Sequence, residues 1–219
     1  LVFFGLALFL YFDDQDQPFS AGVSLVLTLV KPHLVYIALP LILLVMWRNR
    51  RWRVIVGLAS AVFVLTAVAL ILRPTMVQDY VQTIANSRLL AFLPATLSGF
   101  LHSTMGWQWP KFALLITLPI AIIVWFRWRD AIDLHSLLSM SLLASVISSP
   151  FGWSYDFVVL LIPILQMAVW LVERRYNRQQ TWLFASLLVA INIGSYVQRV
   201  IGVSETYYFW MPIAFSIVY

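Results

Sequence analysis

The sequence predicts an all-α, polytopic membrane helical bundle with about eight or nine membrane segments and no soluble domain. Hydrophobic residues occupy 62% of the 219 positions, and charged residues occupy only 11%. Soluble globular domains are roughly 45–50% apolar and about 25% charged, so this composition indicates an integral membrane protein. Long apolar runs alternate with short basic clusters, and three such clusters hold nine of the 14 lysines and arginines. This distribution is typical of membrane topology rather than of nucleic-acid binding.

The basic clusters also predict which ends of the segments face the cytoplasm. They are Arg48–Arg53, Arg127–Arg129 and Glu173–Arg178. Under simple alternation of the spans all three fall on one side, which the positive-inside rule makes cytoplasmic. The chain has no cysteine, and its three histidines are far apart in sequence. No cofactor and no metal site are therefore expected.

The first elements are the tail of a membrane helix and an acidic loop. The apolar run Leu1–Phe12 ends at Asp13–Pro18, which holds three carboxylates in four residues. These carboxylates resemble a metal site, but a solvated loop is the simpler interpretation. Because the chain starts and ends inside apolar runs, residues 1–219 are interpreted as a single transmembrane domain that is truncated at both ends.

The next apolar segment, Ala21–Trp47, is interrupted by Lys31-Pro32-His33. As one helix it would be about 40 Å long, more than the roughly 30 Å hydrocarbon core. Pro32 removes a helical hydrogen bond and drives Lys31 toward extended geometry. The segment is either one tilted, kinked helix or a hairpin of two half-helices that meet at Lys31-Pro32-His33. We favour the hairpin, which places the acidic loop on the cytoplasmic side.

The remaining expected spans are Val54–Leu72, Pro110–Phe126, Leu134–Ile147, Phe157–Val172, Thr181–Val197 and Tyr208–Tyr219. The long mixed segment Arg73–Trp109 is expected on the non-cytoplasmic side. Within it, apolar residues at helical spacing predict an amphipathic interfacial helix. They are Val77, Tyr80, Val81 and Ile84. Leu134–Ile147 would be only about 21 Å long as a helix, so the following loop, Ser148–Asp156, is expected to dip below the interface.

Lys31 is the first candidate binding residue. A lysine in an apolar segment usually marks a pathway or a binding site. Beside a broken helix near the outer face, its ammonium suits the phosphate or pyrophosphate of a lipid-linked ligand. In the alternative interpretation Lys31 snorkels to the interface and binds nothing. His33 is expected to be structural, with a backbone carbonyl as its partner.

The Ser148–Asp156 loop supplies the second set of candidates. Trp153 and Tyr155 offer flat faces for stacking a sugar or a prenyl chain, and Asp156 offers an acceptor for hydroxyls. An ordinary loop with aromatic side chains at the headgroups is the alternative. A general-base role for Asp156 is the weaker of its interpretations.

Other charged residues lie on the expected outer side. The basic ones are Arg73, Arg88, Lys111 and Arg199. Positive charge there runs against the topology trend and invites an anionic ligand, although scattered interface residues are the simpler interpretation. Asp79 and Glu205 are expected to be solvated.

Two short motifs and the segment pattern carry a family resemblance. Leu29-Val30-Lys31-Pro32, the Arg50–Arg53 cluster and the Ser149–Tyr155 loop together resemble glycosyltransferase family 87. The resemblance implies a GT-C-like fold in a multi-pass plasma membrane protein, here of a bacterial inner membrane. It implies a polyprenyl-phosphate sugar donor, with mannose the typical hexose, a glycan or glycolipid acceptor, and transfer on the outer face. Membrane lipid is then a partner and nucleic acid is not.

The resemblance also distributes the expected roles. Lys31 would bind the donor phosphate, and Trp153, Tyr155 and Asp156 would bind substrate. GT-C enzymes generally hold the catalytic carboxylate in a first outer loop, which is expected to precede Leu1, so the catalytic residue is unknown. A divalent metal is used by some GT-C enzymes and not by others, and no ligand set supports one here.

Two other functions are compatible with the same residues. A transporter or flippase of lipid-linked saccharides would also use an intramembrane cation and broken helices. It predicts symmetry-related internal repeats, and no convincing repeat is found. A non-catalytic scaffold subunit is the third interpretation.

Overall fold

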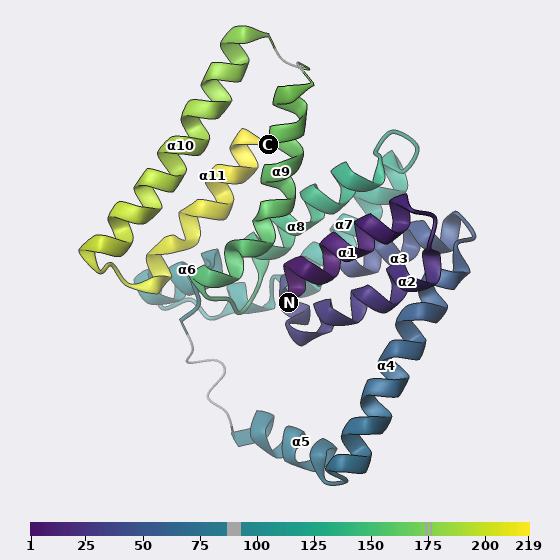
Figure 1. The fold of residues 1–219 in the computed structure, drawn as a ribbon. Coiled ribbons are helices and arrows are strands. Elements are labelled where there is room, and N and C mark those ends of the chain that lie inside the picture. The colour runs from purple at the N-terminus through teal and green to yellow at the C-terminus, as the bar shows by residue number, and fades with distance from the viewer. Residues whose placement is uncertain (87–92, 174, 176) are drawn as a thin grey trace. The chain divides into compact units, whose positions relative to one another are not determined.

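The computed structural model describes residues 1–86, 93–173, 175 and 177–219, and in these residues the regular elements are all helices (Figure 1). This confirms the predicted all-α class. The chain forms two compact units, which are described separately below. The first unit comprises Leu1–Pro32 and Leu43–Phe92, and the second comprises His33–Ile42 and Leu93–Tyr219. A single transmembrane domain stays a prediction.

The first unit begins with a helical pair followed by a break at Lys31. Its helices are α1 (Val2–Asp14), α2 (Pro18–Ser24), the 3-10 helix η1 (Leu25–Val30), the end of α3 (Ala38–Arg48), α4 (Trp52–Leu72) and α5 (Met76–Asn86). Lys31 ends η1 with φ −138° and ψ 72°. This geometry lies outside the α region, which a following proline disfavours. Because α-helical geometry ends at Ser24 and returns only at Ala38, the predicted segment Ala21–Trp47 is not one helix.

Two glycines let α2 and α4 cross with their backbones in contact. A Cβ placed on Gly22 would lie 2.0 Å from the carbonyl oxygen of Val54, and one on Gly57 would lie 2.3 Å from that of Phe19. Small residues at a helix crossing permit this approach, which van der Waals packing then stabilises in a membrane. The crossing therefore depends on the absence of a side chain at both positions.

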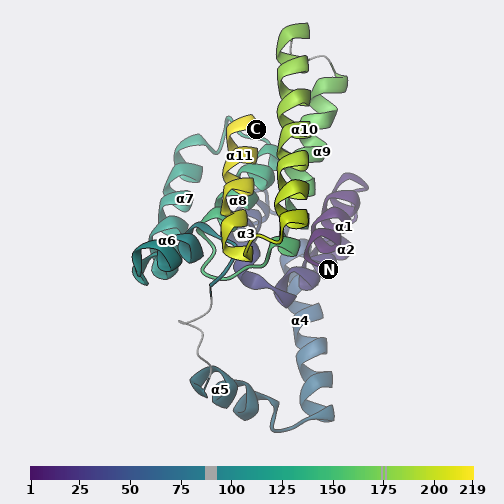
Figure 2. The same ribbon diagram turned by 90° about the vertical axis from the view of Figure 1, so that its left-hand side faces the viewer.

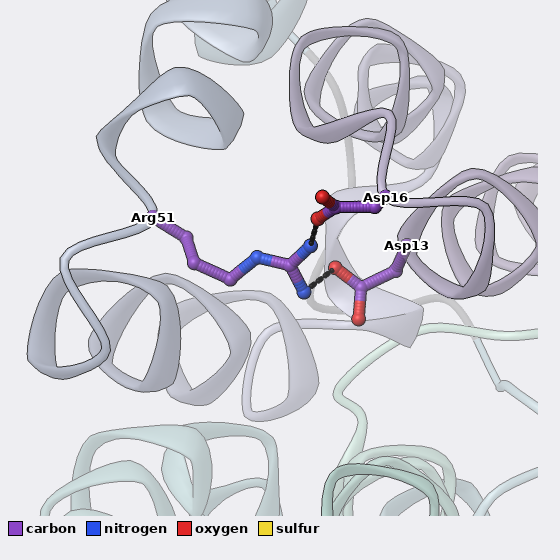
Figure 3. Close-up of polar contacts among 3 residues, drawn as sticks. All are labelled: Asp13, Asp16 and Arg51. Carbon is purple, nitrogen blue, oxygen red and sulfur yellow. Dashed lines mark hydrogen bonds and ion pairs between the residues drawn. The ribbon is translucent and has the colours of Figure 1, made fainter.

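An ion triad closes the hairpin at the end opposite Lys31. Arg51 Nη1 donates to Asp13 Oδ1 at 2.5 Å, and Arg51 Nη2 donates to Asp16 Oδ1 at 2.9 Å (Figure 3). The chain therefore leaves the acidic loop at Asp16 and is back beside it at Arg51, so the intervening segment makes two passes. This confirms the hairpin interpretation. The two passes are roughly 22 Å and 16 Å long, shorter than a full membrane crossing.

The predicted amphipathic helix is α5, and its formation is confirmed. Val77, Tyr80 and Val81 are exposed on it. At its start, Arg73 Nε donates to Asp79 Oδ2 at 2.8 Å, and the Thr75 hydroxyl donates to the same oxygen at 2.9 Å. Its position on a membrane interface stays a prediction.

The second unit is organised around α8 (Figure 2). Its other elements are the 3-10 helix η2 (Pro32–Leu34), the start of α3, α6 (Leu97–Met105), η4 (Trp109–Phe112), α7 (Leu114–Trp128), η5 (Ser154–Leu160), α9 (Leu161–Val172), α10 (Arg178–Ile201), η6 (Glu205–Phe209) and α11 (Trp210–Val218). α8 spans Leu134–Ser148 and is buried on most of its circumference. It packs against α7, α9 and α11, and α11 in turn packs against α10.

Four helical segments of the described residues are long and apolar enough to cross a membrane. They are Trp52–Leu72, Trp109–Trp128, Ser154–Val172 and Arg178–Ile201. Pro18–Val30, Ala38–Arg48 and Leu134–Ser148 are apolar but shorter. These findings support a membrane protein without confirming the predicted eight or nine segments, because the hairpin arms and α8 are too short to be counted as full spans.

Two local features of the second unit differ from the sequence prediction. α10 extends beyond Thr181–Val197 because Asn177 and Gln180 cap its start reciprocally and Gly202, at φ 76°, ends it in the left-handed conformation. α6 was not predicted at all. It lies inside the mixed segment Arg73–Trp109, where polar and small residues obscure the apolar periodicity.

Candidate functional site

The loop after α8 is held by hydrogen bonds to two carboxylates. Asp156 Oδ2 accepts from the backbone N–H of Trp153 at 3.0 Å, and Glu205 Oε2 accepts from the backbone N–H of Ser154 at 3.1 Å. Asp156 lies in the 3-10 helix η5, three residues after Trp153, whereas Glu205 lies in η6. The N–H groups of Trp153, which caps η5, and of Ser154, which begins it, are thus satisfied by two separate elements.

Trp153 and Tyr155 carry two aromatic rings on this hydrogen-bonded stretch of backbone. The rings of Trp153 and Tyr155 are stacked, with centroids 6.1 Å apart and planes within 10° of parallel. Both residues are exposed, at 41% and 62% respectively, whereas Asp156 is buried at 5%. The structure therefore brings the three predicted residues together in one place. Asp156 supports the backbone beneath the rings, and Trp153 and Tyr155 present open faces.

The segment before α6 holds the other half of the loop. Ala95 N–H donates to the Gly152 carbonyl at 2.8 Å, and the Ser98 hydroxyl reaches the Ser149 carbonyl at 3.5 Å. Ser149, Pro150 and Gly152 are buried. His33 packs edge-to-face on Phe151, with ring centroids 6.3 Å apart, while its predicted carbonyl partner stays a prediction. The part of the loop before Trp153 is therefore mostly buried in protein, and its depth in a membrane stays a prediction.

Glu205 is the residue of this region that the sequence analysis misplaced. It was expected to be solvated, but it is only partly exposed and bonds to a loop 51 residues away. Its helix η6 is anchored on α6, where Phe209 stacks on Phe100 with centroids 4.0 Å apart. No local signal in the sequence links Glu205 to Ser154, because the contact exists only through the packing of α6 and η6.

An apolar groove begins where the loop begins. It has a volume of about 450 Å³ and runs between α7 and α8, with the start of α3 as a further wall. Its lining includes Ile120 and Val124 of α7, and Met140 and Ala144 of α8. Ser148, the first residue of the loop, also lines it. The groove therefore reaches the residue at which the loop begins.

Hydroxyl groups gather at the loop end of the groove. The Tyr36 hydroxyl lies 2.5 Å from the Thr117 hydroxyl and 2.5 Å from that of Ser148. Thr117 also donates to the Ala113 carbonyl at 3.0 Å, and Ser148 donates to the Ala144 carbonyl. Thr117 and Ser148 of this cluster line the groove together with Ser141, and most of the other lining residues are apolar.

Lys31 belongs to the first unit, whereas Trp153, Tyr155 and Asp156 belong to the second. Its backbone N–H donates to Thr28 O at 3.3 Å, and its side chain is partly exposed. It sits at the tip of the hairpin, opposite the ion triad of Asp13, Asp16 and Arg51. The position agrees with the predicted cation beside broken backbone, and phosphate binding there stays a prediction.

The remaining outer basic residues differ from one another in environment. Arg73 is exposed and paired with Asp79. Lys111 is buried, with 3% exposure, which the interpretation as a scattered interface residue does not explain. Arg199 is exposed in the last turn of α10. Arg88 lies outside the described residues. A buried lysine at membrane depth is a candidate functional residue.

The structure also bears on metal binding. No group of three or more His, Asp or Glu side chains that could hold a metal ion occurs within residues 1–86, 93–173, 175 and 177–219. The acidic loop, which resembles a metal site in sequence, instead directs Asp13 and Asp16 to the guanidinium of Arg51 (Figure 3).

The apolar helices and the broken segments support a helical membrane protein. The family model for glycosyltransferase family 87 matches residues 1–151. Because this match covers most of the chain, the chain belongs to glycosyltransferase family 87 and is a membrane glycosyltransferase. No curated protein matches the chain, and no solved structure matches it.

The extent of the match separates the candidate residues. It includes Lys31 and the Arg50–Arg53 cluster, and it ends at Phe151, within the loop. Trp153, Tyr155, Asp156 and Glu205 lie beyond it. Family membership therefore rests on the hairpin, α4 and the helices through α8, while the case for the aromatic loop rests on its geometry.

Proposed function

We propose that this glycosyltransferase transfers a hexose, mannose in the first instance, from a polyprenyl-phosphate donor to a glycan or glycolipid acceptor. Transfer takes place on the outer face of the plasma membrane. The observation that carries the proposal is the groove between α7 and α8. It is largely apolar, and its lining includes Ser148, the first residue of the loop that exposes two stacked aromatic rings.

The groove supports a substrate with a hydrocarbon tail. Each methylene that leaves water for an apolar environment contributes about 0.8 kcal/mol, but in a bilayer the tail is already solvated by lipid. The contribution of the groove is thus shape and orientation rather than hydrophobic driving force. A tail seated along α7 and α8 would bring its head group to the hydroxyl cluster of Tyr36, Thr117 and Ser148.

The aromatic pair supports recognition of a saccharide. The C–H faces of a hexose are apolar while its edges carry hydroxyls, so a flat ring beneath and polar groups at the rim match both parts of a sugar. Aromatic side chains with two χ angles lose little entropy when they are fixed in place. Trp153 and Tyr155 are the exposed faces, and Asp156 holds them from below.

Lys31 is proposed to bind the donor phosphate. In the reaction the acceptor hydroxyl attacks the anomeric carbon, and the bond from that carbon to the phosphate oxygen breaks. Polyprenyl phosphate departs with the bonding electron pair, and a general base accepts the hydroxyl proton. No residue of this chain is assigned as that base. A lysine ammonium stabilises the charge that develops on the leaving phosphate.

The test is transfer by the purified full-length protein in detergent, where no second compartment exists. Polyprenyl-phosphate mannose labelled in the sugar is mixed with a glycolipid acceptor, and glycosidic product is measured. Transfer supports the enzyme. Movement of labelled lipid across vesicles without any product would instead favour a transporter or flippase of lipid-linked saccharides.

The role of Lys31 is tested in the same assay. Lys31→Ala is expected to lower kcat/KM for the donor by about 100-fold, because a hydrogen-bonded ion pair to phosphate is worth about 2–3 kcal/mol. Lys31→Arg should retain part of the activity. Arg178→Ala, which removes a positive charge from the third basic cluster, is the matched control and should behave as wild type. Unchanged donor kinetics in Lys31→Ala would remove Lys31 from the site.

A further inference from the structure

We infer that Glu205 is a positioning residue for the saccharide-binding loop. It holds the backbone between Trp153 and Tyr155 and thereby fixes the two rings in their stacked arrangement. The inference rests on the proposed function, since the rings are taken to bind a saccharide, but the contact itself is independent of that assignment.

The first argument is the location of the hydrogen bond. Glu205 Oε2 accepts from the N–H of Ser154, which lies between the two aromatic residues in sequence. The neighbouring N–H, of Trp153, is accepted by Asp156 Oδ2. Two charge-assisted hydrogen bonds on successive N–H groups fix the two peptide planes on either side of the Trp153 Cα atom. A rotation of either plane would turn the Trp153 ring relative to that of Tyr155.

The second argument is that the two carboxylates do not play the same part. Asp156 closes a local turn, because its own N–H donates back to the Trp153 carbonyl at 2.9 Å. Glu205 reaches the loop from η6 instead. It therefore sets where the local turn sits against the rest of the unit, whereas Asp156 sets only the shape of the turn.

The third argument is the rigidity of the element that carries Glu205. Phe100 of α6 stacks on Phe209 and meets Tyr207 edge-to-face at 6.2 Å, so η6 is packed against α6. The segment that leads into α6 bonds to Gly152, which directly precedes the aromatic pair. α6 and η6 thus form one support for the loop. The loop contacts this support through Ala95 at Gly152 and through Glu205 at Ser154.

The substrate class follows from this arrangement. Fixed rings with a polar, half-buried carboxylate beneath them suit a neutral saccharide better than an isoprenoid chain, which needs no fixed orientation of its support. The inference is therefore that Glu205 affects binding of the sugar part of a substrate and leaves the chemical step unchanged.

The experiment compares Glu205→Ala with Glu205→Gln in the purified full-length protein. The Gln side chain keeps an oxygen that can accept from Ser154, so it should rescue most of the function. Hydrogen exchange of the peptide that covers residues 151–160 reports directly on the hydrogen bond between Glu205 and Ser154. About fivefold faster exchange is expected in Glu205→Ala, with little change in Glu205→Gln, since one such bond is worth roughly 1 kcal/mol.

The kinetic readout separates positioning from general loss of structure. Glu205→Ala should raise, by about tenfold, the same substrate KM that Trp153→Ala raises, and should leave kcat within about twofold. Glu173→Ala, which removes an exposed glutamate at the end of α9, is the matched control and should change neither exchange in the loop nor KM.

A second variant removes the N–H that donates to Glu205 and so tests the same hydrogen bond without changing Glu205. Ser154→Pro removes the N–H that Glu205 accepts, and Pro is well tolerated at the first position of a helical turn. If Glu205 acts through Ser154, Glu205→Ala should have no further effect on KM in the Ser154→Pro background, whereas independent roles would give additive effects.

The outcomes are distinguishable. Unchanged exchange at residues 151–160 in Glu205→Ala would show that Glu205 does not hold the loop, whatever the kinetics. Suppose that exchange is faster in Glu205→Ala and that the substrate KM rises in Trp153→Ala but not in Glu205→Ala. That result would overturn the positioning role of Glu205. If exchange accelerates and neither variant changes any KM, the contact stands, but the saccharide-binding loop of the proposed function is wrong and the positioning role falls with it.

Discussion

Lys31 in the first unit and the Ser148–Asp156 loop in the second are both places where a proline follows the end of an apolar helical segment. They are stabilised in different ways. Just before and at Lys31, neighbours in the sequence supply the hydrogen bonds, since the Lys31 N–H donates to Thr28 O at 3.3 Å and Thr28 Oγ1 donates to Leu25 O at 2.6 Å. At the loop the partners come from distant elements, Glu205 and Ala95 among them.

The comparison shows two solutions to one physical problem. Backbone that leaves helical geometry in an apolar environment needs partners for its N–H and C=O groups. Short 3-10 turns supply them locally, and the hairpin is then held by close helix packing at Gly22 and Gly57. The loop supplies them through side chains and leaves two aromatic rings exposed. Substitutions should therefore affect the first region through steric fit and the second through hydrogen bonding.

The largest effect is expected at the α2–α4 crossing. Gly22→Ala or Gly57→Ala places a Cβ 2.0 or 2.3 Å from a backbone oxygen, which only separation of the helices can relieve. The cost should be about 3 kcal/mol or more. Gly152→Ala is the control from the loop, since its Cβ would meet nothing closer than 3.4 Å. Unfolding in a fixed detergent is the measurement, and equal stability of all three variants would contradict the steric account.

The ion triad should give the next effect and a test of burial. Arg51→Ala should destabilise the first unit by about 2 kcal/mol, since it removes charge-assisted hydrogen bonds to two carboxylates. The Asp13 side chain is 11% exposed and that of Asp16 is 92% exposed. Asp13→Asn should therefore cost more than Asp16→Asn, which should stay below about 1 kcal/mol. The reverse order in thermal unfolding would show that the hairpin does not depend on this contact.

The aromatic pair should give an effect on function without one on stability. Trp153→Ala is expected to lower kcat/KM for one saccharide substrate by about tenfold, because a stacking contact is worth roughly 0.5–1.5 kcal/mol. Tyr155→Phe should have a smaller effect, since it keeps the ring. Trp182→Ala, an exposed tryptophan on α10, is the matched control. Equal loss in Trp182→Ala would mean that the pair is an ordinary part of the aromatic belt.

The smallest effect is expected at the start of α8, at the end of the helix opposite the loop. Asp133 caps α8 by accepting from the Ser136 N–H at 2.9 Å. Partial burial raises the pKa of Asp133, but hydrogen bonds from Ser136 and His135 outweigh this, so the pKa lies below its ordinary value. Asp133→Ala should cost about 1 kcal/mol at neutral pH.

The sign of the pH dependence follows from the lowered pKa. Stabilisation by Asp133 is complete above its ordinary pKa of about 3.9 and is lost as the pH falls through the lower folded-state value. Hydrogen exchange of residues 134–140 should therefore differ between wild type and Asp133→Ala at pH 7, and the difference should shrink in strong acid. A difference that persists there, or exchange that changes in the loop as well, would contradict a local cap.

Much of the fold could be predicted from the sequence because apolar length and proline position act locally. α4 begins two residues before its predicted start, α8 ends one residue after its predicted end, and the break falls at Lys31-Pro32 as predicted. The helix α6 was missed, since its residues Leu97–Met105 mix glycine, serine and histidine with few apolar positions. The site was predicted in part, because Trp153, Tyr155 and Asp156 share one short stretch of sequence.

The sequence by itself determined the all-helical membrane class, the broken segment at Lys31 and the family resemblance, since each depends on residues that are neighbours along the chain. Tertiary structure alone decided that Asp13 and Asp16 meet Arg51, that Lys111 is buried, and that Glu205 reaches Ser154. These contacts join residues that are dozens of positions apart. Their existence depends on how helices pack, because the residues next to a carboxylate in the sequence do not indicate which distant N–H will donate to it.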